Sequence, residues 1–217
     1  MIRLSNVTKY FDVKGRRKYL MRNVSLTIPS SINIGILGSN GAGKSTFLRM
    51  LGRIDFPNKG RIESNKKISW PLGLTSGFQG SLTGKENAQF ICRVYSKSDA
   101  ELRRTLDFIN EFSELGRYFD MPVKSYSTGM RARLGFAMSL AFEFDYYLID
   151  ETLSVGDQKF REKCTAALRN FSAQRNILLV SHNMKVLEQM CDSGILLKDG
   201  EFTYFEDIRE ATKAYTA

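Results

Sequence analysis

The chain has 217 residues, of which 42% are hydrophobic and 25% charged, and its formal net charge is +9. This composition is typical of a globular protein and excludes a disordered, collagen-like or low-complexity chain. The longest apolar runs span about half of a bilayer, and Met1–Phe11 lacks the apolar core of a signal peptide. We therefore expect a protein that works in the cytosol unless a partner moves it.

The basic excess, 32 Lys and Arg against 23 Asp and Glu, is spread over short clusters rather than one stripe. It fits a nucleic-acid binder, a protein resting on an anionic membrane surface, or an ordinary solvated surface, and charge alone does not choose among them. Cys92, Cys164 and Cys191 lie far apart, and a single histidine leaves too few soft ligands for zinc. We expect reduced, mostly buried thiols.

Taken in chain order, the first predicted elements are strands. Residues alternate between apolar and polar over Ile2–Thr8 and Val24–Ile28, as half-buried strands do, and Lys14–Lys18 between them is predicted to be a basic hairpin loop. Ile32–Leu37 is almost wholly apolar, which is typical of a strand buried on both faces. A glycine-rich turn follows, and Ser45–Arg53 is predicted to be helical.

A helical stretch then interrupts the strand pattern. Glycines punctuate the loop from Gly73 to Gly84, and helices are predicted at Lys85–Tyr95 and Ser98–Phe112, the second with a capping box between Ser98 and Glu101. The stretch from about residue 79 to residue 141 shows no strand pattern, so it is predicted to be a helical insertion.

The parallel-strand pattern returns after this insertion. Three apolar strands alternate with two helices, in the order Tyr146–Ile149, Gln158–Ala173, Ile177–Val180, Met184–Cys191 and Gly194–Leu197. Strands that alternate with helices predict an α/β fold with a parallel sheet. A hairpin around Asp199–Gly200 ends the sheet, and a short helical tail, Glu206–Ala217, follows it.

The first chemical motif lies between the buried strand and the first helix. Residues 38–45, Gly-Ser-Asn-Gly-Ala-Gly-Lys-Ser, match G-x-x-x-x-G-K-[ST] in the strand–loop–helix context that this motif requires. The glycines let backbone N–H groups turn around phosphate oxygens, and the start of the helix adds its positive end. Lys44 is predicted to reach the β- and γ-phosphates of ATP, and Ser45 to coordinate Mg²⁺. The predicted nucleotide-binding residues here are Gly38, Ser39, Asn40, Gly41, Ala42, Gly43, Lys44, Ser45 and Thr46.

Three further candidates follow two of the later strands. Asp150 and Glu151 come at the carboxyl end of a strand, where ligands of open α/β sheets bind. Asp150 is predicted to join the Mg²⁺ shell, and Glu151 to polarise a water aimed at the γ-phosphate. His182 directly follows the strand Ile177–Val180, so it is expected at the same edge, where its imidazole could bond the γ-phosphate or hold the attacking water. Without the phosphate loop, a helix-capping acidic pair and a structural histidine would be the simpler interpretation.

These motifs, in this order, resemble the ATP-binding cassette (ABC) ATPases over essentially the whole chain. Tyr126-Ser-Thr-Gly-Met130 looks like a relaxed form of the LSGGQ signature, Ser154-Val-Gly-Asp157 resembles the D-loop, and His182 resembles the switch histidine. The resemblance implies a P-loop NTPase (RecA-like) core with an N-terminal antiparallel β subdomain and an inserted α-helical subdomain. The single ABC ATPase domain would cover residues 1–217, with the core and β subdomain in 1–78 and 142–217 and the helical subdomain in 79–141.

The resemblance also implies a shared site. In this family Ser127 and Gly129 act on the P-loop of a second copy, so a head-to-tail dimer would close around two ATP molecules, with Asp157 as a further nucleotide-binding candidate. Thr128 and Met130 replace the glycine and glutamine of the common signature, and Thr152 replaces the usual proline. We therefore expect a slow or partner-dependent ATPase.

Two more site residues are candidates through the resemblance alone. Phe11, with Tyr10 and Tyr19 as alternatives, would stack on the adenine ring. Gln79 would sense Mg²⁺ and relay to the transport partner, although it lies closer to the segment Thr83–Asn87 than in the common loop.

The segment Ile68–Gly84 narrows the resemblance further, to the ATPase subunits that export capsular polysaccharide across the Gram-negative inner membrane. This implies an integral membrane permease and envelope polysaccharide-export proteins as partners, and a location at the cytoplasmic face of the inner membrane. An exporter of O-antigen or teichoic acid, a cytosolic ABC ATPase acting on nucleic acid, and a nucleotide-gated regulatory module remain as alternatives. No nucleic-acid partner is expected, because a second cassette, coiled-coil arms and zinc modules are not visible in the sequence.

Overall fold

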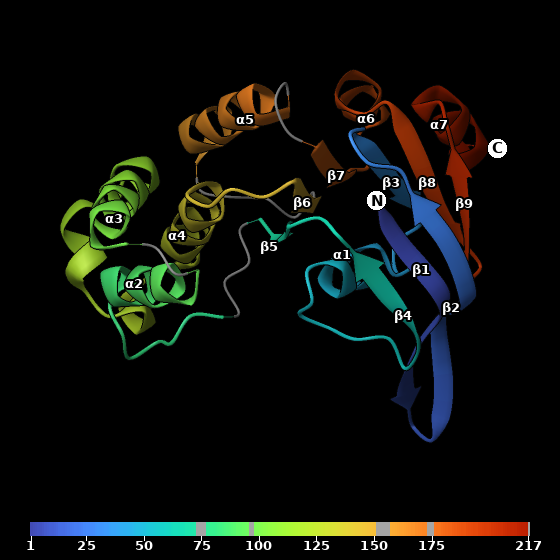
Figure 1. Ribbon diagram of the computed structural model, residues 1–217, viewed down its shortest axis with the longest axis horizontal. Helices are drawn as coiled ribbons and strands as arrows, with labels where there is room; N and C mark the ends of the chain where they lie inside the picture. The colour runs from blue at the N-terminus through green and yellow to red at the C-terminus, as the bar shows by residue number, and fades with distance from the viewer. Residues whose placement is uncertain (73–76, 96–97, 151–156, 173–175, 217) are drawn as a thin grey trace. The chain divides into compact units, whose positions relative to one another are not determined.

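The computed structural model describes residues 1–72, 77–95, 98–150, 157–172 and 176–216. It divides into two compact units (Figure 1). The first contains Met1–Pro71, Phe144–Glu151 and Ala166–Ala217, and the second contains Leu72–Glu143 and Thr152–Thr165. Each unit has its own hydrophobic core. Among the described residues, no helix is both long and apolar enough to cross a membrane.

The first unit is built on a six-stranded sheet with the order β5-β6-β7-β3-β8-β9. The strands are β3 (Ile34–Gly38), β5 (Ile68–Pro71), β6 (Tyr146–Asp150), β7 (Asn176–Val180), β8 (Ser193–Lys198) and β9 (Glu201–Phe205). Neighbouring strands are parallel except β9, which runs antiparallel to β8. The predicted α/β fold with a parallel sheet is therefore confirmed, although β3 begins two residues later than expected.

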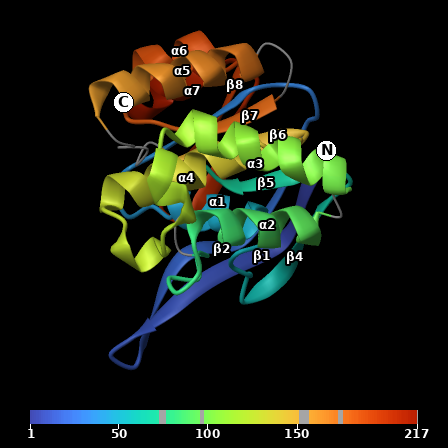
Figure 2. The same ribbon diagram turned by 90° about the vertical axis from the view of Figure 1, so that its left-hand side faces the viewer.

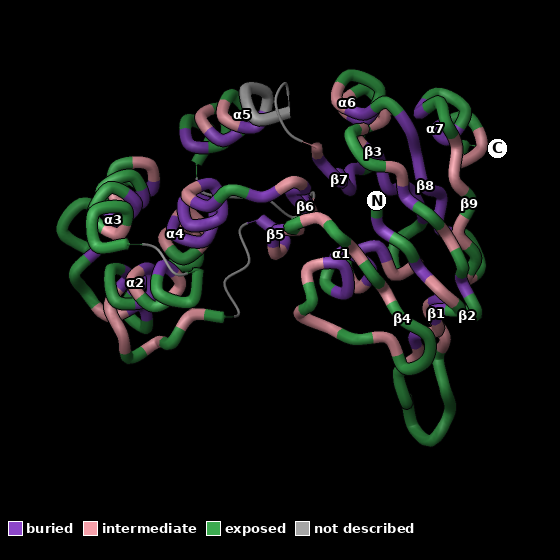
Figure 3. The backbone as a smooth tube through the Cα atoms, viewed as in Figure 1, coloured by how far each residue is buried: buried purple, intermediate pink, exposed green. Residues whose placement is uncertain are grey.

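One face of this sheet carries two helices, α6 (Met184–Met190) and α7 (Ile208–Thr216). Two glycines on neighbouring strands let α7 approach closely. A Cβ atom at Gly35 would lie 2.6 Å from Cδ1 of Ile208, and one at Gly194 would collide with Ala211. The buried strands β7 and β8 are purple in Figure 3. Burial on both faces explains why these strands are apolar runs rather than alternating patterns.

The first unit also contains a three-stranded antiparallel sheet with the order β2-β1-β4. Its strands are β1 (Ile2–Val13), β2 (Arg16–Ile28) and β4 (Lys59–Ser64). Inward-facing residues of this sheet share one core with the main sheet and with helix α1 (Lys44–Leu51); members include Ile2, Leu4, Ile34, Phe47 and Tyr146. The core therefore ties the antiparallel sheet and α1 to the strand that precedes the phosphate loop.

Some predicted elements were wrong. The basic segment Lys14–Lys18 is not a loop, because the turn consists of Lys14 and Gly15 alone, with φ of 49° and 76°. Such a two-residue turn matches the twist of a hairpin, so Arg16–Lys18 stays in the strand and pairs with β1. Strands β4 and β5 were not predicted, because β4 is a largely exposed polar edge strand and β5 is short and ends in proline.

The second unit is helical. It contains α2 (Gly84–Val94), α3 (Asp99–Ser113), α4 (Thr128–Leu140), the start of α5 (Gln158–Ser172) and two short 3₁₀ helices, Gly116–Asp120 and Val123–Ser125. Helix α3 packs against both α2 and α4, as Figure 2 shows. The predicted capping box of Ser98 and Glu101 is confirmed, and Thr83 and Glu86 form a second one at the start of α2.

All three cysteines are buried and unbridged, as the sequence predicted. Burial raises the pKa of the Cys164 and Cys191 thiols to about 12. Both therefore stay protonated near neutral pH and behave as small apolar side chains.

Candidate functional site

The glycine-rich loop connects β3 to α1 in the first unit. Gly41 and Gly43 have φ of 83° and 103°, a left-handed conformation that glycine adopts without strain. Gly43 is the N-cap residue of α1, so no side chain caps this helix, and its first turn carries no acidic residue. The N–H groups at the start of α1 are therefore left to bind an anion.

Lys44 completes this anion-binding cradle. Its side chain is buried, and its Nζ atom donates to the carbonyl oxygens of Gly38 at 2.6 Å and Ser39 at 3.0 Å. The ammonium group thus lies inside the curve of its own loop. A buried ammonium beside uncapped helical N–H groups fits the phosphate chain of a nucleotide.

The order of the parallel strands brings two other candidates to the same sheet edge. β6 lies beside β7, and β7 lies beside β3. Asp150 is half-buried at the end of β6, in register with Val180 of β7. His182 follows β7 and is exposed, and Asn183 beside it caps α6 by accepting from the N–H groups of Lys185 and Val186. Gly38 and Asp150 are the last residues of β3 and β6, and His182 comes two residues after β7, so the three lie at the same end of adjacent parallel strands, as predicted. Glu151 lies outside the described residues.

The aromatic candidates lie on the β1–β2 hairpin of the same unit. β2 passes against the phosphate loop, since a Cβ atom at Gly43 would lie 3.3 Å from Cβ of Leu20. Phe11 is 45% exposed, with Nζ of Lys9 5.1 Å from its ring centroid. The rings of Tyr10 and Tyr19 instead pack on each other at 5.3 Å. Phe11 is thus the candidate whose ring remains open to a ligand.

Gln79 belongs to the second unit, and a buried asparagine fixes its backbone. Asn87 accepts from the Gln79 N–H at 2.9 Å and donates to the Gln79 carbonyl oxygen at 3.1 Å, while it also bonds the Thr83 carbonyl at 2.8 Å. The side chain of Gln79 is exposed and donates to Ser81. The sequence pattern predicted no role for Asn87. The feature that could have identified it is a polar amide on the buried face of an amphipathic helix, α2.

Ser127 and Gly129 begin α4 in the second unit. Ser127 is the N-cap residue, and its Oγ accepts from the Met130 N–H at 3.2 Å. The preceding turn is held by Tyr126, which is buried, donates to the Tyr118 carbonyl, and accepts from Arg131 at 3.1 Å. The serine hydroxyl is therefore fixed on a rigid turn and remains exposed.

Asp157, also in the second unit, accepts a hydrogen bond on each of its two carboxylate oxygens. Its Oδ1 accepts from the Phe160 N–H at 2.9 Å, and its Oδ2 accepts from Arg133 at 2.7 Å. The Phe160 N–H, with Arg133 and Lys159, lowers the pKa of this carboxyl below its ordinary value. Asp157 thus caps the start of α5 and pairs with α4.

Arg133 joins Asp157 to a second carboxylate, that of Glu114. Its guanidinium lies 3.0 Å from Glu114, which also binds Lys163 at 2.9 Å. The Lys163 hydrogen bond is the main cause that lowers the pKa of Glu114. No functional role was predicted from the sequence for Glu114, Arg133 or Lys163. The feature that could have identified Arg133 is that it and Arg131 are the only charged residues of α4.

Comparison with known proteins identifies the family. The family model described as "ABC transporter" matches residues 21–154. The chain belongs to the ABC transporter family. Its fold is that of an ABC ATPase cassette. The ATP-binding cassette MJ0796, solved as a dimeric post-hydrolysis state bound to ADP and Pi, superposes with a TM-score of 0.77, at 25% identity over 96% of this chain and 99% of that one.

The more similar relatives of this ABC protein are export ATP-binding proteins. It is 48% identical to the polysialic acid transport ATP-binding protein KpsT of Escherichia coli, over 99% of this chain and 98% of KpsT. It is 43% identical to the capsule polysaccharide export ATP-binding protein CtrD of Neisseria meningitidis serogroup B, over 100% and 99%. The teichoic acids export ATP-binding protein TagH of Staphylococcus epidermidis is 37% identical, over 94% and 77%.

Proposed function

We propose that this chain is the ATP-hydrolysing subunit of an ABC exporter that drives capsular polysaccharide across the inner membrane. The observation that carries the proposal is its full-length similarity, at 43–48% identity, to ATP-binding proteins named for the transport of polysialic acid and capsule polysaccharide. The phosphate-binding loop supports the ATP-dependent part of the proposal independently, because its geometry follows from this chain alone.

ATP binds to the first unit in this proposal. The loop from Gly38 to Thr46 wraps the phosphates, and the Lys44 ammonium exchanges its loop carbonyls for β- and γ-phosphate oxygens. Phe11 stacks on the adenine. The uncapped start of α1 supports the first role, and the half-exposed ring of Phe11 beside the loop-contacting strand supports the second.

Mg²⁺ fits the donor set at this sheet edge. The Ser45 hydroxyl and the Asp150 carboxylate are oxygen ligands of the type Mg²⁺ prefers, and Mg²⁺ commonly takes only one or two protein ligands beside phosphates and water. Gln79 is a third candidate ligand. When bound, the ion neutralises charge on the β- and γ-phosphates.

Hydrolysis requires a residue that activates water. Glu151, which follows Asp150, accepts a proton from the attacking water, and His182 holds that water or the γ-phosphate in line. The position of His182 after β7, next to the loop-bearing strand, supports this role.

The complete site needs a second copy of the chain. Ser127 and Gly129 of one copy contact the γ-phosphate bound to the other, and Asp157 lies at the same interface. The dimeric state of MJ0796 and the exposure of Ser127 on its turn support this arrangement. Closure on two ATP molecules and reopening after hydrolysis would move a membrane-embedded partner.

The remaining parts of the proposal concern organisation and partners. Residues 1–217 form one ABC ATPase domain, in which residues 79–141 are a helical subdomain that receives an integral membrane permease near Gln79. Envelope polysaccharide-export proteins continue the path, and the chain sits peripherally at the cytoplasmic face of the inner membrane. Export of teichoic acid is less well supported, because TagH is less similar and this chain covers 77% of it.

The test is deletion of the gene followed by microscopy of the cell envelope. We expect capsular polymer to accumulate inside the cytoplasm and to return to the surface when the wild-type gene is restored. Restoring Lys44→Ala should leave the polymer inside, whereas the exposed Lys198→Ala should behave like wild type. Normal surface polymer in the deletion strain would refute the proposed export role.

A further inference from the structure

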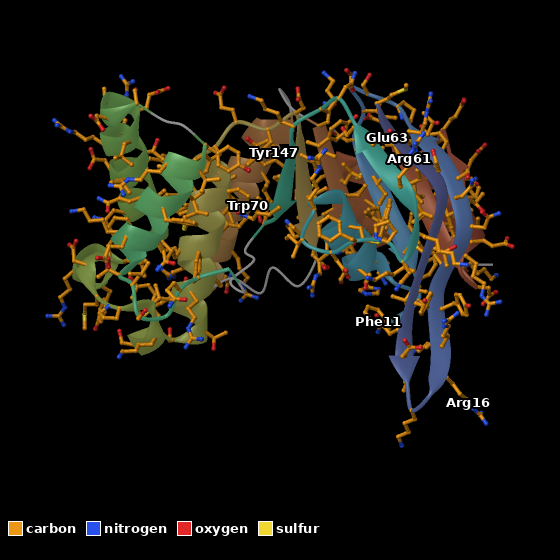
Figure 4. The ribbon with its side chains drawn as sticks, turned by 60° about the horizontal axis from the view of Figure 1, so that its bottom comes forward. Phe11, Arg16, Arg61, Glu63, Trp70 and Tyr147 are labelled. Carbon is orange, nitrogen blue, oxygen red and sulfur yellow. The ribbon has the colours of Figure 1, made fainter. Side chains whose placement is uncertain are left out.

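The β1–β2 hairpin of the first unit extends beyond its sheet. β4 pairs with β1 only as far as Thr8 and Lys59, so the residues after Thr8 have β2 as their single strand neighbour. Every residue from Phe11 to Lys18 is exposed. Figure 4 shows the end of this hairpin projecting from the sheet, with Arg16 directed outward. A two-stranded ribbon is marginally stable by itself, so its exposed end calls for an explanation.

The two faces of this ribbon differ in how their side chains are partnered. Directly paired residues share a face. On one face, Arg17 lies 4.6 Å from the Tyr10 ring centroid and 3.9 Å from Asp12, and Tyr10 packs on Tyr19. The aromatic and charged groups of this face therefore satisfy one another.

On the other face, the Nζ atom of Lys9 lies over the Phe11 ring, but Val13, Arg16 and Lys18 form no ion pair or ring contact among the residues that the structure describes. Val13 pairs with Arg16 in register, and Phe11 pairs with Lys18, which places these four side chains on one face. Val13 is 50% exposed. Within the described part of the chain, Lys14, Arg16 and Lys18 make no ion pair or side-chain hydrogen bond. We call Val13, Lys14, Arg16 and Lys18 the hairpin tip.

Extending the proposed function, on which this inference rests, we propose that the hairpin tip binds the surface of a bilayer that contains anionic phospholipids. The cations lie where they can meet lipid phosphates, and Val13 supplies an apolar contact at the headgroup boundary. Anionic membrane surfaces bind clusters of basic residues, and an exposed apolar neighbour strengthens this binding. Phe11 is not included, because we assign its ring to the adenine.

The number of basic residues in the hairpin tip determines how strongly substitutions there should weaken membrane binding. A lysine or arginine near an anionic membrane surface strengthens binding by about fivefold. Removing two of the tip cations should therefore weaken binding by about 25-fold. The same argument predicts that salt weakens the interaction, because the groups are fully exposed.

The experiment measures co-flotation of the nucleotide-free full chain with vesicles of phosphatidylcholine, with and without phosphatidylglycerol. Wild type should float only with the anionic vesicles, and Lys14→Gln with Arg16→Gln should lose about 25-fold in affinity. The matched control removes two exposed cations from α3, with Arg103→Gln and Arg104→Gln, and should change affinity by less than about twofold. Unchanged thermal unfolding verifies that the tip variant is folded.

A second measurement reports contact directly. A polarity-sensitive dye on Val13→Cys should shift to the blue with anionic vesicles and not with neutral ones, while the three native cysteines stay buried. Equal binding to neutral vesicles, equal loss in both double variants, or binding of single-stranded RNA in place of vesicles would overturn the proposal. Without lipid, ATP turnover by the tip variant should equal that of wild type. The vesicle experiments therefore test only membrane binding by the hairpin tip, and a negative result there would leave the proposed ATPase function standing.

Discussion

At the scale of single residues, the phosphate loop shows how strongly a few positions constrain the chemistry. Gly43 supplies a left-handed backbone and, lacking a side chain, leaves the start of α1 uncapped. Lys44 is buried against the carbonyls of Gly38 and Ser39, so its ammonium is already desolvated and oriented. Because a buried ammonium group is costly unless it is paired, phosphate oxygens that replace these two carbonyls should bind it strongly.

Lys44→Ala should weaken ATP binding by at least about 100-fold, because hydrogen bonds to charged groups contribute about 1.5–3 kcal/mol each. Fluorescence titration with a labelled ATP analogue measures this affinity. Lys198→Ala, an exposed cation of the same unit, is the control and should bind like wild type. Retained tight binding by Lys44→Ala would show that the loop does not hold the phosphates.

At the scale of elements, the helix starts of the second unit combine stability with function. Thr83, Ser98 and Ser127 cap α2, α3 and α4 through the same side-chain-to-backbone bond. In the proposed function, Ser127 has a second task, which is to face the nucleotide of another copy. Two serines with the same structural role but different proposed functions allow the two contributions to be separated.

Ser98→Ala and Ser127→Ala should each lower the free energy of unfolding by about 1 kcal/mol, because each removes an N-cap. Urea unfolding measures this. Only Ser127→Ala should also reduce ATP turnover, and ATP binding by the isolated chain should persist. Ser127→Arg should abolish turnover. A parallel loss of turnover in Ser98→Ala would indicate that capping alone, rather than contact with ATP, explains the effect.

The ion pairs around Arg133 connect two elements of the second unit. Arg133 lies on α4, which begins directly after Ser127 of the predicted signature, and it holds Asp157 at the start of α5. Glu114 binds both Arg133 and Lys163, so the pairs form a network rather than isolated contacts. The signature helix and the Asp157 carboxylate are therefore held together within the unit.

Arg133→Ala should lower the free energy of unfolding by about 1 kcal/mol at neutral pH, the upper range for partly exposed pairs. The pKa values of Glu114 and Asp157 are lowered in the folded chain from ordinary values of 4.5 and 3.8. Their stabilising contribution is therefore present above those values and is lost as the pH falls through the lower folded values. Urea unfolding at neutral and acidic pH should show the difference between variant and wild type shrinking in acid. A constant difference would argue against the ion pairs.

At the scale of the whole molecule, the proposed site is split between copies. The phosphate loop, Asp150 and His182 belong to one unit of the chain, and Ser127, Gly129 and Asp157 belong to the other. Because each chain has one loop and one signature, two copies would supply two sites. Association should therefore depend on ATP and on slow hydrolysis.

Glu151→Gln should reduce ATP turnover by about 100-fold or more, as loss of a general base does, while ATP binding is kept. The variant should then accumulate as a dimer with ATP and Mg²⁺ and remain a monomer without nucleotide. Light scattering coupled to gel filtration measures the mass. A variant that stays monomeric with bound ATP would contradict the shared site, and unchanged turnover would remove Glu151 from its role.

Much of the fold follows from local pattern. Apolar runs identified β3, β6, β7 and β8, because strands covered on both faces leave no polar positions, and the capping box of Ser98 located α3. The polar edge strand β4 and the short strand β5 were not predicted from the sequence, because their pairing depends on partners that are distant in the chain. The hairpin turn was misjudged because its basic residues resemble a loop until the register is known.

The sequence alone predicted a phosphate-binding loop, and its conformation follows from the sequence because the spacing of its glycines and lysine constrains the backbone locally. It also determined the family through the order of the motifs. Only the tertiary structure decided that Asn87 holds Gln79, that Arg133 holds Asp157, and that the cations of the hairpin tip have no ion-pair partner among the described residues. Those contacts join residues that become neighbours only when strands and helices pack, and local pattern carries no information about such distant pairing.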